Sequence, residues 1–250
     1  MTVKKTRAAI SIVLVEPEKP VNVGLVARSM ACYGLPDLRI VGSPKITEHV
    51  DAKKTAKNSE AILTGVKYFS TLDEAIADSH YALGFTRRVR EPGQRMETLS
   101  DTLMHWTPNR THTALIFGRE SQGLFQSETL SLSHLVTIPM EDDKISLNLS
   151  HAVAIALYVF NEKKEQKFSE LKRESNVDSN DEIFPALRNE AQLFLSELLM
   201  KLESSAFFKD GKREAQINYV KILMQRLNPT QSEIQFLTGM LQKLNVKNKS

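Results

Sequence analysis

Residues 9–34 read AISIVLVEPEKPVNVGLVARSMACYG, an apolar run followed by a helical pattern. The run at 9–16 is apolar nearly throughout, as expected of a strand that is buried on both faces of a sheet. Apolar residues then recur at helical spacing over 22–34, with Asn22 as the expected N-cap and Gly34 as the expected residue just past the helix end. A buried strand followed directly by a helix predicts the start of a parallel α/β sheet.

The same alternation of strands and helices continues to about residue 164. Thr71 and Glu74 form the capping-box pattern that opens a short helix. The further expected strands are 38–42, 66–70, 81–85, 113–118 and 135–139, and the further helices are 52–64, 71–78 and 147–164. Strands that alternate with helices in this way predict an α/β fold with a parallel sheet and helices on both faces.

The organisation of the chain changes after residue 164. Residues 165–182 are polar and predict a linker, and apolar stripes at helical spacing follow it. We expect a helix with Pro185 in its first turn, a second at 212–227 and a third at 230–244. The predicted domains are therefore 1–164, an α/β domain, and 183–250, a small C-terminal helical extension.

Composition excludes several classes of protein. The chain has 250 residues, of which 41% are hydrophobic and 25% charged, so general disorder is excluded. No stretch is long and apolar enough to span a membrane, and Glu16 closes the N-terminal apolar run without a cleavage signal. The single cysteine, Cys32, allows no internal disulfide or cysteine-based metal site, which favours a cytoplasmic protein without a metal. The net charge of +3 leaves nucleic acid open as a partner.

The chain lacks the G-x-G-x-x-G, G-x-x-x-x-G-K-[ST], H-E-x-x-H and G-x-S-x-G motifs. Dinucleotide-dependent oxidoreductases, P-loop NTPases and α/β-hydrolases are therefore disfavoured. Glycines and polar residues gather instead where the predicted strands end, and open α/β sheets bind ligands there. These places are Asn22-x-Gly24-x-x-x-Arg28, GFTRRVR at 84–90, FGRESQGL at 117–124 and IPMEDDKISLNLSHAVAIALY at 138–158.

Each of these segments, taken alone, also has a purely structural interpretation. Asn22 would be a helix cap, the arginines of 84–90 a solvated charge run, the glycines of 117–124 a tight turn, and Ser146 an N-cap. In this order, however, the first, third and fourth segments resemble the three motifs of the SpoU/TrmH family of the SPOUT superfamily. The resemblance covers about residues 10–160.

That resemblance implies a trefoil-knotted α/β fold, which periodicity alone does not predict, since it favours an open sheet. It implies an RNA ribose 2'-O-methyltransferase that uses S-adenosyl-L-methionine (AdoMet) and acts as a homodimer with its sites at the interface. Residues 212–244 resemble a branch of the family that modifies tRNA at the first nucleotide of the anticodon loop, position 32. The implied target is therefore a cytidine or uridine of tRNA.

By the same resemblance, five residues are expected to be catalytic. Arg28 would clamp a phosphate and stabilise the developing alkoxide, because a guanidinium stays protonated and is a poor general base. Asn22 would position the substrate or Arg28, and Glu120 would orient the Arg28 guanidinium by a bidentate pair. Ser146 and Asn148 would supply a hydroxyl and an amide beside the cofactor and the target ribose.

The resemblance also implies that AdoMet rests on three loops at the strand ends. The expected cofactor contacts are Phe85, Thr86, Arg87, Gly118, Ile138, Ile145, Ser146 and Leu147. Arg28, Arg88 and Arg90 are expected to contact RNA, since several arginines on one loop suit phosphates.

The sequence departs from many relatives at Arg87, where they have a small residue, and at Lys144-Ile145, where some have a tyrosine. Alternatives to the tRNA enzyme are a related enzyme that acts on ribosomal RNA or another tRNA position, and a non-catalytic RNA-binding module. The catalytic set argues for an enzyme, because binding alone does not need all of it. His151 and Cys32 are expected to be structural.

Overall fold

The computed structural model describes residues 9–106, 111–142, 145–173 and 184–244. Seven strands form one sheet in the order β3-β2-β1-β6-β4-β7-β5, and every pair is parallel. The strands are β1 (Ala9–Val15), β2 (Asp37–Val41), β3 (Lys67–Phe69), β4 (Tyr81–Phe85), β5 (Met96–Thr98), β6 (His112–Phe117) and β7 (His134–Thr137). The predicted parallel sheet is confirmed, while the knot stays a prediction. β1 pairs with β2 on one side and β6 on the other, so the order switches direction there.

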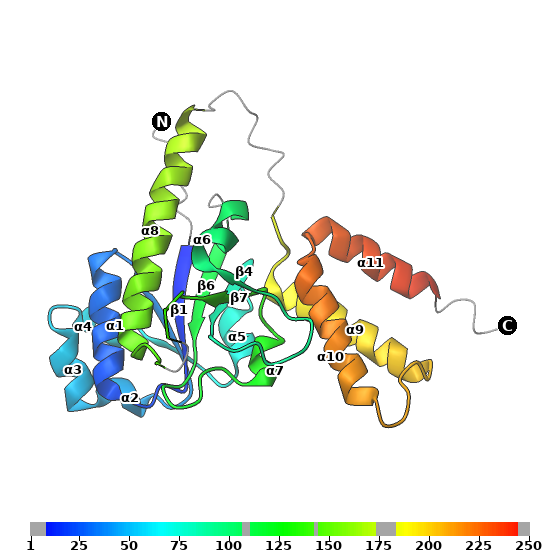
Figure 1. The fold of residues 1–250 in the computed structure, drawn as a ribbon, viewed down its shortest axis with the longest axis horizontal. Helices are drawn as coiled ribbons and strands as arrows, with labels where there is room; N and C mark the ends of the chain where they lie inside the picture. Colours follow the sequence, from blue (N-terminus) through cyan, green and yellow to red (C-terminus); the bar gives the residue numbers. More distant parts are fainter. Residues whose placement is uncertain (1–8, 107–110, 143–144, 174–183, 245–250) are drawn as a thin grey trace.

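Helices cover both faces of the sheet (Figure 1). One face carries α1 (Pro20–Cys32), α3 (Val50–Ala56), α4 (Glu60–Thr64), α6 (Leu99–Thr102) and α8 (Leu149–Arg173). The other face carries α5 (Leu72–Ile76) and residues 124–135, which include α7 (Gln126–Thr129). The remaining short helices of this domain are α2 (Lys45–Glu48) and the 3-10 turn Leu103–His105.

The alternation of side chains along β1 explains this layering. Ile10, Ile12 and Leu14 lie in the core under α1 and α8, and Val13 and Val15 lie in the core on the opposite face. Because successive side chains of a strand point to opposite faces, a nearly continuous apolar run fills both cores.

Three predicted helix boundaries were wrong. The helix expected at 52–64 is broken into α3 and α4 by Lys57 and Asn58, whose φ angles are +25° and +67°. α1 begins at Pro20 and not after Asn22, since proline is suited to the first helical position. α8 continues to Arg173, into the predicted linker, because its last turns contain neither glycine nor proline. The rest of that linker lies outside the described residues.

The three expected C-terminal helices are present as α9 (Arg188–Ser204), α10 (Arg213–Leu227) and α11 (Gln231–Leu244). Pro185 is not in the first turn of α9, because its backbone forms a β-bridge with Thr230. The capping box of Thr230 and Glu233 is confirmed by the reciprocal hydrogen bonds at the start of α11. None of the described helices is long and apolar enough to cross a membrane.

The C-terminal helices dock on the sheet domain through the start of α9, on the side of α5 (Figure 1). The backbone N–H of Arg188 donates to the carbonyl of Ser79 at 2.8 Å, and that of Asn189 donates to the carbonyl of Ala77 at 3.1 Å. These bonds satisfy two of the N–H groups that a helix start leaves without partners.

Candidate active site

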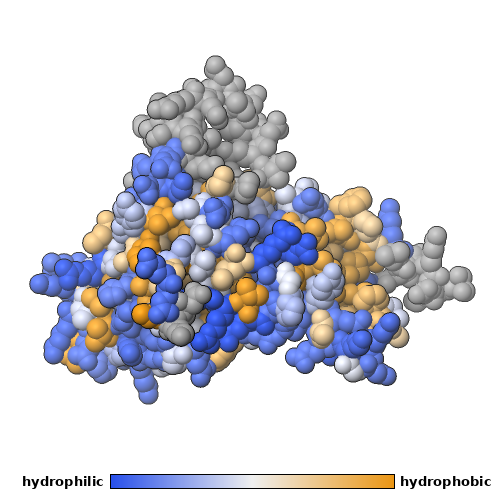
Figure 2. All heavy atoms as spheres, in the orientation of Figure 1, coloured by the Kyte–Doolittle hydropathy of each residue, from blue (hydrophilic) through white to orange (hydrophobic). Residues whose placement is uncertain are grey.

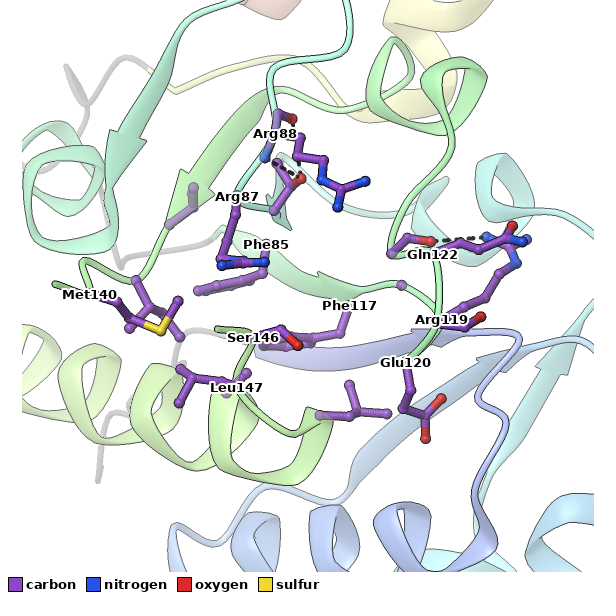
Figure 3. A pocket seen from close by; sticks show the side chains of 18 of the residues that line it. Phe85, Arg87, Arg88, Phe117, Arg119, Glu120, Gln122, Met140, Ser146 and Leu147 are labelled. Atoms are coloured by element: carbon purple, nitrogen blue, oxygen red, sulfur yellow. Dashed lines mark hydrogen bonds between the residues drawn. The ribbon is translucent and has the colours of Figure 1, made fainter. Parts of the chain in front are cut away.

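A pocket of about 210 Å³ opens at the carboxyl ends of β4, β6 and β7 (Figure 3). The rings of Phe85 and Phe117 stack beneath it, with centroids 4.4 Å apart and planes 10° apart. It is lined by Phe85, Thr86, Arg87, Arg88, Arg90, Phe117, Gly118, Arg119, Glu120, Ser121, Gln122, Gly123, Val136, Ile138, Met140, Ser146, Leu147, Leu149 and Ala152. Seven of the eight predicted cofactor contacts are in this set, and Ile145 is the exception.

The loop after β6 forms one wall of the pocket, and its two glycines are required by its shape. A Cβ atom on Gly118 would lie 2.2 Å from the carbonyl carbon of Gly123. Gly123 has a φ of +69°, and its N–H donates to the carbonyl of Arg119 at 2.8 Å. The tight turn that the glycines indicate is therefore also a wall of the site.

Arg119 holds this loop in place, a role that only its position in FGRESQGL indicates in the sequence. Its Nε donates to Glu16 at 2.9 Å, and its two Nη atoms donate to Glu128 at 3.1 and 3.0 Å. The guanidinium also lies 3.9 Å from the ring centroid of Phe125. Burial opposes its charge, but the hydrogen bonds to Glu128 and Glu16 raise the pKa of Arg119.

Hydrogen bonds join the three motifs beside the pocket. The Glu120 carboxylate accepts the backbone N–H groups of Glu18 and Lys19, at 2.8 and 3.1 Å, and the side-chain amide of Asn22 at 2.9 Å. The Asn22 carbonyl oxygen accepts the amide of Asn148 at 3.0 Å. Asn22 is 2% exposed, so its amide has no access to water as an alternative partner. The helix dipole also stabilises a carboxylate at the start of α1.

Arg28 is separated from this network. It lies six residues beyond Asn22, about 9 Å along the axis of α1, and its side chain is exposed. Within the described residues of one chain it forms no hydrogen bond or ion pair, and the expected pair with Glu120 is absent. The Glu120 carboxylate instead accepts the three N–H groups at the start of α1.

The arginine-rich loop after β4 crosses the pocket and contacts the second and third motifs (Figure 3). Arg87 donates to the carbonyl of Ile145 at 2.6 Å, and Arg90 donates to the carbonyl of Gln122 at 2.7 Å. Arg88 lies between them, with its backbone N–H on the hydroxyl of Thr86 at 3.1 Å. The pocket is therefore lined by more positive than negative charge. The Ile145 side chain is 64% exposed, so only its carbonyl contributes here.

The two polar residues of the third motif have different positions: one caps a helix, and the other lines the pocket. The Asn148 side-chain oxygen accepts the N–H of Ser150 at 2.8 Å, which makes Asn148 the cap of α8. Ser146, which spacing alone favoured as a cap, lines the pocket instead. Met140, two residues after Ile138, also lines it and was missed, although it lies in the quoted segment.

Two further residues were expected to be structural. His151 is exposed on α8 and does not line the pocket. Cys32, expected to serve packing and not chemistry, is exposed at the end of α1, so a packing role was wrong. In the part of the chain that the structure describes, no group of histidine, cysteine, aspartate and glutamate side chains is arranged to hold a metal ion.

Comparison with known proteins shows which proteins the chain resembles. The model of the SpoU rRNA Methylase family matches residues 9–158. A relative from Salmonella choleraesuis (strain SC-B67), named tRNA (cytidine/uridine-2'-O-)-methyltransferase TrmJ, is 29% identical over 244 residues, 96% of this chain and 98% of its own.

Two solved structures share the fold. TrmJ from Z. mobilis ZM4 has a TM-score of 0.78 and 24% identity, over 95% of this chain and 100% of that chain. The SpoU methyltransferase AviRb from Streptomyces viridochromogenes, solved in complex with AdoMet, has a TM-score of 0.50 and 19% identity, over 67% of this chain and 64% of that chain.

Proposed function

Because the chain belongs to the SpoU rRNA methylase family, we propose that it transfers a methyl group from AdoMet to a ribose 2'-hydroxyl of tRNA. The observation that carries the proposal is the network of Glu120, Asn22 and Asn148, which joins all three family motifs at the edge of one pocket. The relative from Salmonella choleraesuis, which matches nearly the whole chain, is named for this activity on tRNA. We extend the proposal to cytidine or uridine at position 32 and to action in the cytoplasm.

The pocket suits AdoMet in its chemistry. The stacked Phe85 and Phe117 rings and the apolar Ile138, Met140 and Leu147 offer contact area to an adenosine and a thioether chain. Backbone groups of the three loops are available for directed hydrogen bonds. When bound, AdoMet supplies an electrophilic methyl group on a sulfonium. The fold of AviRb, solved with AdoMet, supports this choice of cofactor.

The ribose hydroxyl has to lose its proton, and negative charge develops on its oxygen. Glu120 is a poor candidate base, because its two oxygens already accept three N–H groups. Ser146 lines the pocket, and its hydroxyl would donate to the substrate. Arg28 would clamp a phosphate of the RNA and stabilise the developing alkoxide, and that phosphate would take up the proton of the hydroxyl. Arg88 and Arg90 would contact neighbouring phosphates.

The exposed position of Arg28 supports a homodimer in which it serves the pocket of the partner. Two copies of α1 that pack antiparallel about an axis near the middle of the helix bring the partner's Arg28 to within about one turn of Asn22. The exposed apolar side chains Val21 on α1, and Ile155 and Tyr158 on the adjacent α8, support an interface on these helices. Figure 2 shows apolar residues along this side of the molecule.

The division into a methyltransferase domain, 1–164, and a C-terminal domain, 183–250, completes the proposal, with the helical domain aiding selection of tRNA. The test is incubation with labelled AdoMet and either unmodified total tRNA or unmodified ribosomal RNA, followed by mapping of 2'-O-methyl sites. We expect label at position 32. Label confined to ribosomal RNA would identify a different target, and no label in either RNA would contradict an enzyme.

A further inference from the structure

A second cavity lies between the C-terminal helices and the sheet domain, and it shares no lining residue with the first pocket. Its volume is about 270 Å³, and it is bounded by α9, α10 and the segment after α7. Its polar lining includes Arg188, Gln192, Ser196, Lys221 and Ser131. The methyl-transfer chemistry proposed above uses none of these residues.

Arg188 is the unusual residue of this cavity, because its buried charge forms no salt bridge with a described residue, and Asp73, the carboxylate that acts on it, is exposed. The residue is 8% exposed, and its backbone N–H on Ser79 fixes it to the sheet domain. One guanidinium nitrogen, Nη2, donates to the carbonyl of Ser131 at 2.7 Å. The Nε atom is buried and has no hydrogen-bond partner, and no carboxylate of the described residues forms a salt bridge with the side chain.

Buried charges in proteins are normally paired, since a lone one loses its hydration without compensation. Burial lowers the pKa of Arg188 to about 10, so the group remains positive at neutral pH. Of its five N–H donors, one is used within the described structure. Arg188 itself lines a cavity that has room for a ligand.

The other charges of the cavity have the same net sign. Lys221 of α10 lines it and forms no salt bridge with a described residue. The single acidic lining residue, Asp73, is exposed, and its carboxylate accepts the amide of Gln192 at 2.8 Å. Two cations thus face one carboxylate that already has a partner.

We propose that this cavity binds a phosphate-type oxyanion, held by the guanidinium of Arg188 and the ammonium of Lys221. A tetrahedral oxyanion has several strong acceptors, and the planar fork of an arginine is suited to them. Because Arg188 is anchored to both Ser79 and Ser131, the bound anion joins α9 and α10 to the sheet domain. Its source is either free phosphate or a backbone phosphate of the RNA.

The first test is thermal unfolding of the full chain in inorganic phosphate, against chloride at matched ionic strength. At about ten times the dissociation constant, phosphate should raise Tm by about 3–5 °C. Arg188→Leu should abolish the Tm shift. Lys221→Met should lower the apparent affinity for phosphate at least several-fold. Arg226→Leu removes an exposed arginine of the same helix as Lys221 and should leave the shift unchanged.

Calorimetric titration of the wild-type protein with phosphate gives a readout that does not depend on the fold of any variant. Absence of both heat and Tm shift would overturn the proposal, as would an equal shift in Arg188→Leu. Neither measurement needs methyl transfer, so a failed methylation assay would not change the outcome of this test.

A binding assay with tRNA distinguishes the two sources of the oxyanion. If phosphate competes with tRNA, and Arg188→Leu weakens tRNA binding about ten-fold or more, the site takes a backbone phosphate. If tRNA affinity is unchanged while the Tm shift is present, the site takes free phosphate.

Discussion

Replacement of Asn22 by aspartate tests the network at the edge of the pocket with a change of one atom. The amide nitrogen of Asn22 donates to Glu120 Oε1 at 2.9 Å, and the variant would place a second carboxylate oxygen at that position. Asn22 is 2% exposed, so water screens the contact poorly. At an effective dielectric constant near 20, two unit charges at this distance repel by about 6 kcal/mol.

At neutral pH, protonation of the introduced aspartate costs less free energy than this charge repulsion. An introduced carboxyl with an ordinary pKa of about 3.9 takes up a proton at pH 7 for about 4 kcal/mol. This value sets the expected loss in the free energy of unfolding. Because the folded variant holds a proton that the unfolded chain does not, the loss should shrink by about 1.4 kcal/mol for each pH unit of acidification.

The assay is urea unfolding of wild type and Asn22→Asp at pH 5.5, 6.5 and 7.5. Asn218→Asp is the matched control, since the Asn218 amide also donates to a glutamate, Glu91, at 2.9 Å but is only half-buried. There the loss should stay below about 1 kcal/mol. A loss at Asn22 that is equally small, or one that does not change with pH, would refute this account of the network.

Three further predictions concern catalysis, loop shape and pH. Arg28→Ala should lower kcat by about 10²–10³-fold with the AdoMet dissociation constant unchanged in calorimetry, and full activity would contradict its proposed role. Gly118→Ala should weaken AdoMet binding at least about ten-fold and lower stability by about 1–3 kcal/mol, because the new Cβ meets backbone at 2.2 Å. Gly239→Ala, in α11 with no atom within 4 Å of the new Cβ, should instead raise stability by about 0.5–1 kcal/mol in the same urea assay. Burial lowers the pKa of both His80 and His134 below 6.5, so the unfolded chain binds protons first and stability should fall as the pH drops from 7.5 to 5.5. His80→Gln should show a smaller fall, and a wild type that becomes more stable at pH 5.5 would exclude this explanation.

The parts of the fold that were predictable from sequence rest on local patterns. The apolar run of β1 and the capping boxes that begin at Thr71 and Thr230 each act over a few residues, and the structure has all of them. Met96–Thr98 was missed because these three residues lack the aromatic side chains that marked the equally short β3 as a strand. The break at Lys57 and Asn58 was missed because neither residue is a glycine or proline.

Sequence reasoning predicted which residues belong to the candidate site better than it predicted their contacts. Residues of the three motifs could be named from the resemblance, and most of the predicted cofactor contacts line one pocket. The pairing of Arg119 with Glu16 and Glu128 depends on where distant segments meet. The isolation of Arg188 depends in the same way on the docking of α9, and no local spacing encodes it.

The placement of Glu120 explains how a chain with a net charge of only +3 can present a basic pocket. Its carboxylate is engaged by the N–H groups at the start of α1, and Arg119 is neutralised by two other glutamates behind the loop. Arg87, Arg88 and Arg90 also line the pocket. Acidic residues thus hold the loops in place, while the arginines line the pocket. A partner subunit's Arg28 would add to that excess, so dimer formation and RNA affinity should rise together.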